Sequence, residues 1–177
     1  MKLLVVVDMQ NDFVTGVLGT KEAESIVSDV AKMIASYDGE VVYTMDTHTE
    51  DYLHTMEGEK LPVTHCVAGT EGWQLVPEIK NAIEHKVSKE FCKPTFGSLE
   101  LQEYVKALNE EQMLEQIDLV GVCTDICVIS NALLLKAAVP EVKICVYEDL
   151  TAGVTEESHL NAINAMKMCH IDILSKE

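Results

Sequence analysis

The sequence has little positive charge. It contains 13 lysine and arginine residues against 30 aspartate and glutamate residues, and its formal net charge is -17 at pH 7. A surface with this excess of carboxylates repels the phosphates of nucleic acids and of anionic lipids. The chain also lacks an apolar run close to the roughly 18 residues that a membrane-spanning helix needs. We therefore expect neither a nucleic-acid partner nor a membrane partner.

Features of several other protein classes are missing as well. The six cysteines are spread through apolar runs and do not frame a small disulfide-linked scaffold. The apolar residues 2–7 are too few for a signal peptide and lead directly into Asp8. A reducing cytoplasm is therefore the expected location. No Gly-x-Gly-x-x-Gly or phosphate-loop motif follows the first apolar run, so nucleotide binding is not favoured.

Apolar runs typical of strands alternate with segments of helical periodicity along the whole chain. This alternation predicts one α/β domain over residues 1–177. We expect a doubly wound, mostly parallel six-stranded sheet with helices on both faces, in a Rossmann-like arrangement of three layers. Strands are predicted over residues 2–8, 40–44, 86–91, 117–122, 143–147 and 171–174. Helices are predicted over residues 21–37, 72–84, 99–109, 125–138 and 156–168. The segment from Asp46 to Thr70 has no regular period.

Polar residues follow three of the predicted strands. Ligands of doubly wound sheets bind outside the carboxyl ends of the strands, and Asp8, Asp46 and residues 123–127 all fall at such ends. Asp8 comes after five consecutive apolar residues. Its carboxylate can take a proton from a thiol and pass it to a leaving group, although a capping or turn role is an equal alternative. We therefore expect an active site at this edge of the sheet.

Cys127 is the candidate nucleophile. It lies just after Thr124-Asp125, a helix-start signal, at the end of an apolar run. The free N–H groups and the positive dipole end of a helix lower the pKa of a thiol, which favours a nucleophilic thiolate. A buried, inert cysteine is the alternative. Lys89 and Lys93 flank Phe91-Cys92, and a lysine held near the thiol would stabilise both the thiolate and an oxyanion.

A metal site is predicted after the second strand. Asp46 and His48 alternate along an extended segment, so both side chains can face one ion. His54, Glu57 and His65 follow in the same polar loop. Imidazole and carboxylate ligands suit zinc, iron or manganese. Such residues also gather by chance in an acidic chain, and this alternative stays open.

Taken together, these segments resemble the isochorismatase-like cysteine hydrolases, and among them the nicotinamidases. The matching segments stand in the family's order and cover almost the whole chain. They are VVVDMQNDF at residues 5–13, the Asp46 and His48 pair, HCVAGT at residues 65–70, KPTFGS at residues 93–98 and GVCTDICV at residues 121–128.

The resemblance implies a catalytic triad, which falls on Asp8, Lys93 and Cys127. Lys93 is preferred because Lys-x-x-Phe-Gly-Ser resembles the family's lysine segment, while Lys89 remains the alternative. The resemblance also implies an oxyanion hole made by the backbone N–H groups of Cys123 and Cys127, with a cis peptide bond between Val122 and Cys123.

Nicotinamidases of this family carry a metal ion that holds the pyridine nitrogen. The implied ligands are Asp46, His48 and His65, with Glu57 or His54 as the fourth, and we favour Glu57. The expected cofactor is therefore one divalent transition metal ion, Zn, Mn or Fe. Isochorismatases, which need no metal, do not require this set of ligands.

One segment departs from the family pattern. Nicotinamidases often place an aromatic residue shortly before the His-Cys segment, where it stacks on the pyridine ring. This chain has Leu61-Pro62-Val63-Thr64 at that point. Phe13 is expected to supply one wall of the substrate site, and Trp73 is a candidate for another.

The resemblance implies an amidohydrolase that converts nicotinamide to nicotinate and ammonia through a cysteine thioester. Alternatives within the family are hydrolysis of another small amide or of isochorismate. A thiol redox protein that uses Cys123 and Cys127 is disfavoured, because the spacing is Cys-x-x-x-Cys rather than Cys-x-x-Cys. A catalytically silent binding protein is disfavoured because the candidate triad is complete. By analogy with the family, the partners expected are a small carboxamide substrate and further copies of the chain in a homo-oligomer.

Overall fold

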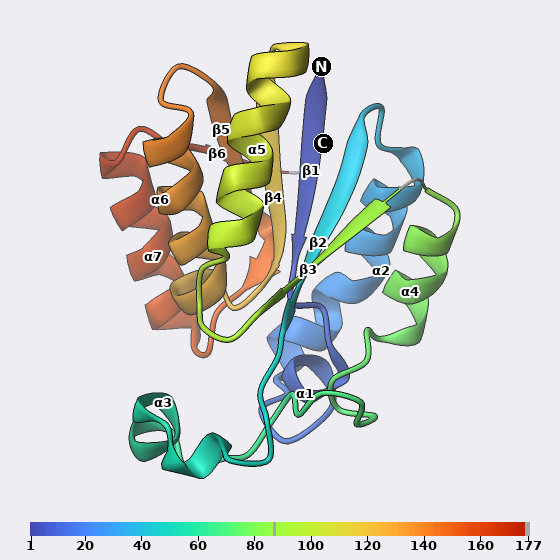
Figure 1. The fold of residues 1–177 in the computed structure, drawn as a ribbon, viewed down its shortest axis with the longest axis vertical. Helices are drawn as coiled ribbons and strands as arrows, with labels where there is room; N and C mark the ends of the chain where they lie inside the picture. The colour runs from blue at the N-terminus through green and yellow to red at the C-terminus, as the bar shows by residue number, and fades with distance from the viewer. Residues whose placement is uncertain (87, 176–177) are drawn as a thin grey trace.

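Residues 1–86 and 88–175, which the computed structural model describes, contain a six-stranded sheet (Figure 1). The strand order is β3-β2-β1-β4-β5-β6, and each pairing of neighbouring strands is parallel. The strands are β1 (Lys2–Val7), β2 (Glu40–Asp46), β3 (Ser88–Lys93), β4 (Gln116–Val122), β5 (Lys143–Ala152) and β6 (Asp172–Leu174). The predicted α/β fold is therefore confirmed, with a sheet that is wholly parallel.

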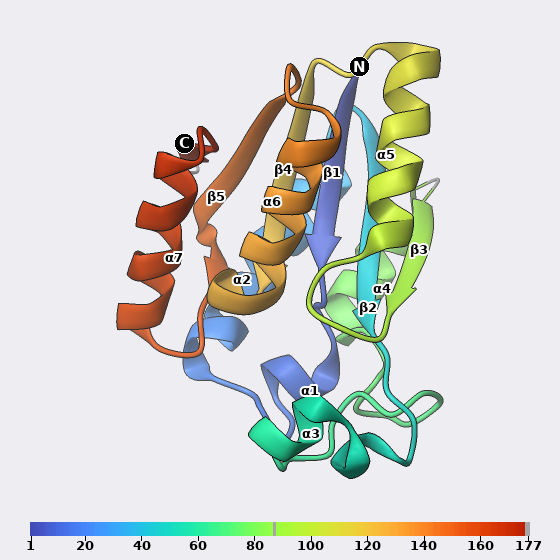
Figure 2. The same ribbon diagram turned by 60° about the vertical axis from the view of Figure 1, so that its left-hand side comes forward.

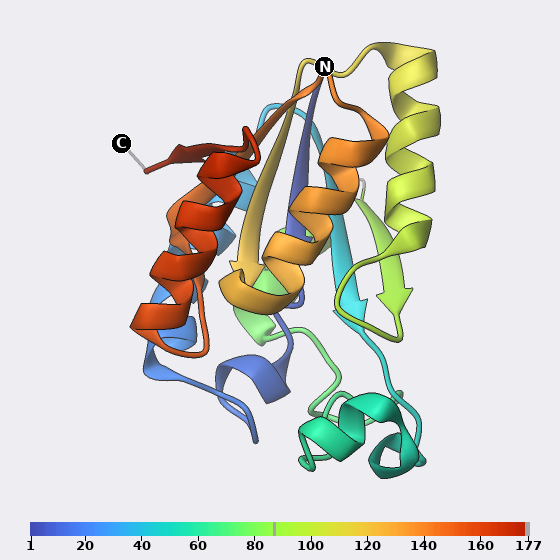
Figure 3. The same cartoon turned by 90° about the vertical axis from the view of Figure 1, so that its left-hand side faces the viewer.

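Helices cover both faces of this sheet. α2 (Lys21–Ser36) and α4 (Pro77–Glu84) lie on one face (Figure 1). α5 (Leu99–Gln112), α6 (Ile129–Ala138) and α7 (Glu156–Met168) lie side by side on the other face, which is turned to the viewer in Figure 3. Within the described part of the chain, no helix combines the length and the apolar character needed to cross a membrane.

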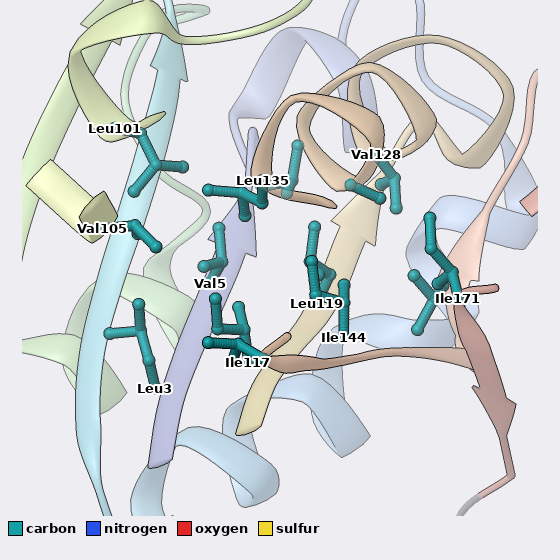
Figure 4. Packing of buried hydrophobic residues seen from close by; sticks show 14 of the residues in the cluster. Leu3, Val5, Leu101, Val105, Ile117, Leu119, Val128, Leu135, Ile144 and Ile171 are labelled. Carbon is teal, nitrogen blue, oxygen red and sulfur yellow. The ribbon is translucent and has the colours of Figure 1, made fainter. Parts of the chain in front are cut away.

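The central strands are buried on both faces because successive side chains point to opposite layers. Leu3 and Val5 of β1 belong to the core beneath α5, α6 and α7, whereas Leu4 and Val6 belong to the core beneath α2 and α4. Figure 4 shows the first of these layers. Burial of each such side chain contributes roughly 1.5 to 3 kcal/mol relative to an exposed one. The two layers therefore fix the position of β1 within the sheet.

The strand order reverses between β1 and β4. The chain runs from β1 through β2 to β3 on one side, and then returns to β4 on the other side of β1. Sheets of this kind bind ligands outside the carboxyl ends of the strands at the reversal point. Three short helical segments lie beyond these ends (Figure 2), namely α1 (Asn11–Val14), the 3-10 turn η1 (Tyr52–His54) and α3 (Met56–Lys60). The sequence analysis predicted none of the three.

The helix predicted from residue 72 begins only at Pro77. The residues before it are held by the segment that follows β1. The backbone N–H of Asn11 donates to the carbonyl of Gln74, and that of Val76 donates to the carbonyl of Met9. A proline suits the first helical position because it has no N–H group to satisfy there. These long-range hydrogen bonds override the helical periodicity of residues 72–76.

The helix predicted over residues 125–138 also begins differently. It opens with a π-helical turn, η2 (Thr124–Val128), and continues as α6. Single π-helical turns occur frequently at functional sites. The strand predicted over residues 86–91 is observed as β3, and residue 87 lies outside the described residues. β5 continues beyond the predicted end at residue 147, after an irregularity in its register with β4.

Truncation of the central core should destabilise the fold. Leu119 of β4 is completely buried. Leu119→Ala is expected to lower the free energy of unfolding by about 2 to 5 kcal/mol, because it leaves a cavity among close-packed side chains. Leu160→Ala is the matched control, since Leu160 of α7 is 50% exposed, and it should change stability by about 0.5 kcal/mol or less. Urea denaturation measures both, and equal losses would contradict the assignment of the core.

Candidate active site

Asp8 leaves the sheet directly after β1, and its backbone turns there with a φ of 47°. Its side chain is fully buried. Oδ1 accepts a hydrogen bond from the hydroxyl of Thr44 at 2.6 Å, and Oδ2 lies 2.7 Å from Nζ of Lys93. The two contacts hold the carboxylate through both of its oxygens.

Lys93 is the last residue of β3 and lies opposite Asp46 in the register with β2. Besides its ion pair with Asp8, its Nζ lies 3.3 Å from Oδ1 of Asp46 and 3.5 Å from Sγ of Cys127. It also donates a hydrogen bond to the carbonyl of Thr95 at 3.1 Å. The Lys93 side chain is only 1% exposed. One buried cation therefore touches the candidate base, the candidate nucleophile and a candidate metal ligand.

Lys89, the alternative lysine, lies away from these groups. Its Nζ is 5.0 Å from the ring centroid of Phe91 and 4.3 Å from that of Tyr104. A cation over aromatic faces is a stable surface arrangement. The structure thus places Lys93, and not Lys89, between Asp8 and Cys127.

Cys127 lies in η2, and Cys123 precedes this turn. The peptide bond between Val122 and Cys123 is cis, as the family resemblance implied. Both cysteines are free thiols and line the same cavity. Asn131 holds η2 in place, because its side-chain amide donates to the carbonyl of Cys127 at 2.8 Å and accepts from the backbone N–H of Ser98 at 2.9 Å.

The thiol of Cys127 has a raised pKa, which corrects the expectation of a lowered one. Burial disfavours the thiolate most strongly, the charge of Asp8 raises the pKa further, and Lys93 offsets only part of this. Burial likewise raises the pKa of the Asp8 carboxyl, against the opposing effect of Lys93. The resting thiol is therefore protonated, beside a carboxylate whose affinity for a proton is also increased.

The second cluster contains Asp46, His48, Glu57 and His65, whose donor atoms all lie within 4.8 Å of one another. Nε2 of His48 lies 2.9 Å from Oδ2 of Asp46 and 3.5 Å from Oε1 of Glu57. Nε2 of His65 lies 3.4 Å and 3.8 Å from the same two oxygens. Ligands about 2.0 to 2.1 Å from a tetrahedral ion lie about 3.3 Å apart. The four donors therefore fit one divalent metal ion.

The polar atoms of this cluster support the same conclusion. Nε2 of His48 is buried and has no hydrogen-bond partner among the described residues. Nδ1 of His65 lies 2.7 Å from the carbonyl of Val63, so a proton on Nδ1 would leave Nε2 free to bind an ion. His54 is exposed and stands outside the cluster. The structure thus brings Glu57, rather than His54, to the other three donors.

Gln10 fixes the backbone of Asp46, a role that the sequence analysis missed. Its fully buried amide accepts from the N–H of Asp46 and donates to the carbonyl of the same residue, each at 2.8 Å. It also donates to the carbonyl of Trp73 at 2.9 Å. Its partners are far away along the chain, so no local pattern reveals them. Asn131 was also missed, and of its two partners Ser98 is distant in the sequence whereas Cys127 is four residues away.

A cavity of about 680 Å³ opens onto both clusters. Cys127, Asp46, Glu57 and His65 line its polar side. Phe13 supplies part of the wall, as expected, with its ring centroid 5.4 Å from that of His65.

Trp73 does not reach the cavity wall. Its indole N–H instead donates to the hydroxyl of Thr47 at 2.9 Å. Leu61 lines the cavity in the segment where the sequence departs from the family pattern. The wall on this side is therefore aliphatic.

Comparisons with known proteins identify a family and several similar chains. The family model described as the isochorismatase domain matches residues 2–177. A nicotinamidase/pyrazinamidase of Mycobacterium tuberculosis is 29% identical over 98% of each chain, and a nicotinamidase of Saccharomyces cerevisiae is 27% identical over 94% of each. A crystal structure of the pyrazinamidase of Pyrococcus horikoshii in complex with zinc is 25% identical, with 99% of each chain covered and a TM-score of 0.82.

A doubly wound sheet with buried polar groups at its reversal point, together with the family match, defines a hydrolase of the α/β class. The chain belongs to the isochorismatase family.

Metal content tests the second cluster directly. We expect the purified protein to bind close to one transition metal ion per chain. His48→Ala should lower this content, because it removes one of the four clustered donors. His54→Ala is the matched control from the same loop and should leave the content unchanged. Elemental analysis of the three proteins measures this, and equal loss in both variants would contradict the ligand assignment.

Proposed function

We propose that the protein hydrolyses nicotinamide to nicotinate and ammonia through a thioester on Cys127. The observation that carries this proposal is the position of Lys93, whose ammonium touches Asp8, Cys127 and the metal-site residue Asp46. A nucleophile and a metal site that share one buried cation suit a substrate with two anchors, a carboxamide and a ring nitrogen. The two relatives named nicotinamidase support the same substrate.

The first half of the reaction transfers the acyl group to the thiol. Asp8 takes the proton of Cys127 as the sulfur attacks the carboxamide carbon, so that no free thiolate accumulates in the buried site. Backbone N–H groups of Cys123 and Cys127 hold the oxyanion of the tetrahedral intermediate. Asp8 then protonates the amide nitrogen as the carbon–nitrogen bond breaks. Ammonia leaves, and the acyl group stays on the sulfur.

The second half regenerates the enzyme. Asp8 takes a proton from a water molecule as the water oxygen attacks the thioester carbon. The carbon–sulfur bond then breaks. Asp8 passes this proton to the sulfur of Cys127. Nicotinic acid leaves and loses its carboxyl proton to the solvent, which gives nicotinate. Burial alone would lower the pKa of Lys93, but the carboxylates of Asp8 and Asp46 raise it by more, so Lys93 keeps its positive charge throughout.

Asp46, His48, Glu57 and His65 would hold the metal ion. When bound, such an ion supplies a Lewis acid that accepts the lone pair of a ring nitrogen. The residues around it orient the ring so that the carboxamide carbon faces Cys127. Zinc suits this set of two imidazoles and two carboxylates, as do manganese and iron.

Ammonia release from nicotinamide tests the function and the nucleophile together. The wild type should release ammonia, and Cys127→Ala should abolish turnover while folding and metal content stay near wild type. Cys123→Ala is the matched control and should retain much of the activity, because only its backbone N–H is assigned a role. An inactive Cys123→Ala beside an active Cys127→Ala would reverse the assignment, and no release by the wild type would refute the function.

The two lysines provide a second matched pair. Lys93→Ala should lower kcat on the order of a hundredfold or more, because the negative charge of the transition state loses its buried partner. Lys89→Ala should leave kcat close to wild type, since Lys89 lies over aromatic rings away from the site. Steady-state kinetics on nicotinamide measures both, with thermal unfolding as the check on folding. Comparable losses in both variants would contradict the placement of Lys93.

A further inference from the structure

The candidate cavity is larger than nicotinamide requires. Pockets of roughly 300 to 1,000 Å³ bury drug-sized molecules, and this cavity of about 680 Å³ falls within that range. Nicotinamide is a single six-membered ring with one carboxamide. A substrate anchored at Cys127 and at the metal cluster therefore fills only the inner end of the space.

The outer end is lined by apolar side chains that the protein itself leaves uncovered. Met56 is 73% exposed, Val154 is 51% exposed and Phe96 is 43% exposed, and all three line the cavity. Leu61, at 37%, and Ile126 extend the same surface. Contiguous exposed apolar surface at a cavity marks a binding surface, because water covers it at a cost in free energy.

The chemistry of this outer surface selects the kind of group that it binds. Its side chains come from α3 and the following loop, from the β3–α5 loop, from η2 and from the β5–α7 loop. Four of them are aliphatic or thioether chains, which adapt in shape and offer no hydrogen bonds. Lys60 of α3 also lines the cavity, and its alkyl stem is apolar although its ammonium is not. The apolar side chains predominate, so the surface favours an alkyl chain or a second ring over a polar substituent.

We propose that the site takes aromatic carboxamides whose ring carries a further apolar group, which extends toward Met56, Phe96 and Val154. This inference rests on the proposed nicotinamidase chemistry and deepens it. With the ring nitrogen held at the metal cluster and the carboxamide at Cys127, ring carbon 5 is the position that is adjacent to neither anchored atom. A substituent at this carbon points away from both clusters and can contact the outer surface.

The test compares kcat/KM for ammonia release from nicotinamide, 5-propylnicotinamide and 5-phenylnicotinamide. Each methylene group buried in an apolar site improves binding severalfold. The substituted amides should therefore exceed nicotinamide by about tenfold or more, chiefly through a lower KM. Met56→Ala should reduce this ratio, because it removes apolar surface beside the substituent. Met168→Ala is the matched control, since Met168 is 82% exposed at the far end of α7, and it should leave the ratio unchanged.

The possible failures are distinguishable. Turnover of nicotinamide with no gain, or with a loss, for the 5-substituted amides overturns this inference and leaves the proposed function intact. A gain that Met56→Ala and Met168→Ala leave equally unchanged overturns the assignment of the outer surface. No ammonia from any of the three amides overturns the proposed function and this inference with it.

Discussion

The buried ammonium of Lys93 is the interaction on which the rest of the site depends. Asp8 and Asp46 are both almost completely buried, and two carboxylates in one water-poor space repel each other. A buried lysine is equally costly without partners, whereas a cation between the two carboxylates offsets the desolvation of all three groups. The same side chain contacts the sulfur of Cys127. The proposed general base, the proposed nucleophile and the candidate metal cluster therefore all contact the same buried cation.

Much of the fold and of the candidate site could be predicted from the sequence where local pattern and geometry coincide. The unbroken apolar run before Asp8 indicates a strand buried on both faces and a carboxylate at its end. Lys89 and Lys93 both lie on β3 and, four residues apart, point to the same face, so their side of the strand does not distinguish them. The two lysines are distinguished by the register of β3 with β2, which pairs Lys93 with Asp46. That register depends on the assembled sheet.

Several of the missed features depend on partners that are distant in the sequence. Gln10 pairs with the backbone of Asp46, and residues 74 and 76 bond to the segment after β1, which delays the start of α4. The pKa of Cys127 was misjudged for a related reason. A helix-start signal is local, whereas burial depends on which side chains pack against η2, and burial has the larger effect.

The two halves of the site have separate structural origins. Three of the four candidate metal donors, His48, Glu57 and His65, lie in the loop after β2, and Asp46 is the last residue of β2. The triad candidates Asp8, Lys93 and Cys127 come from three separate segments of the chain. Loops change in length and sequence during evolution far more readily than the strands that they connect. A change in this loop can therefore replace three of the four donors while the sheet keeps Asp8, Lys93 and Cys127 in place. Asp46, at the end of β2 and beside Lys93, is the one donor that such a change leaves behind.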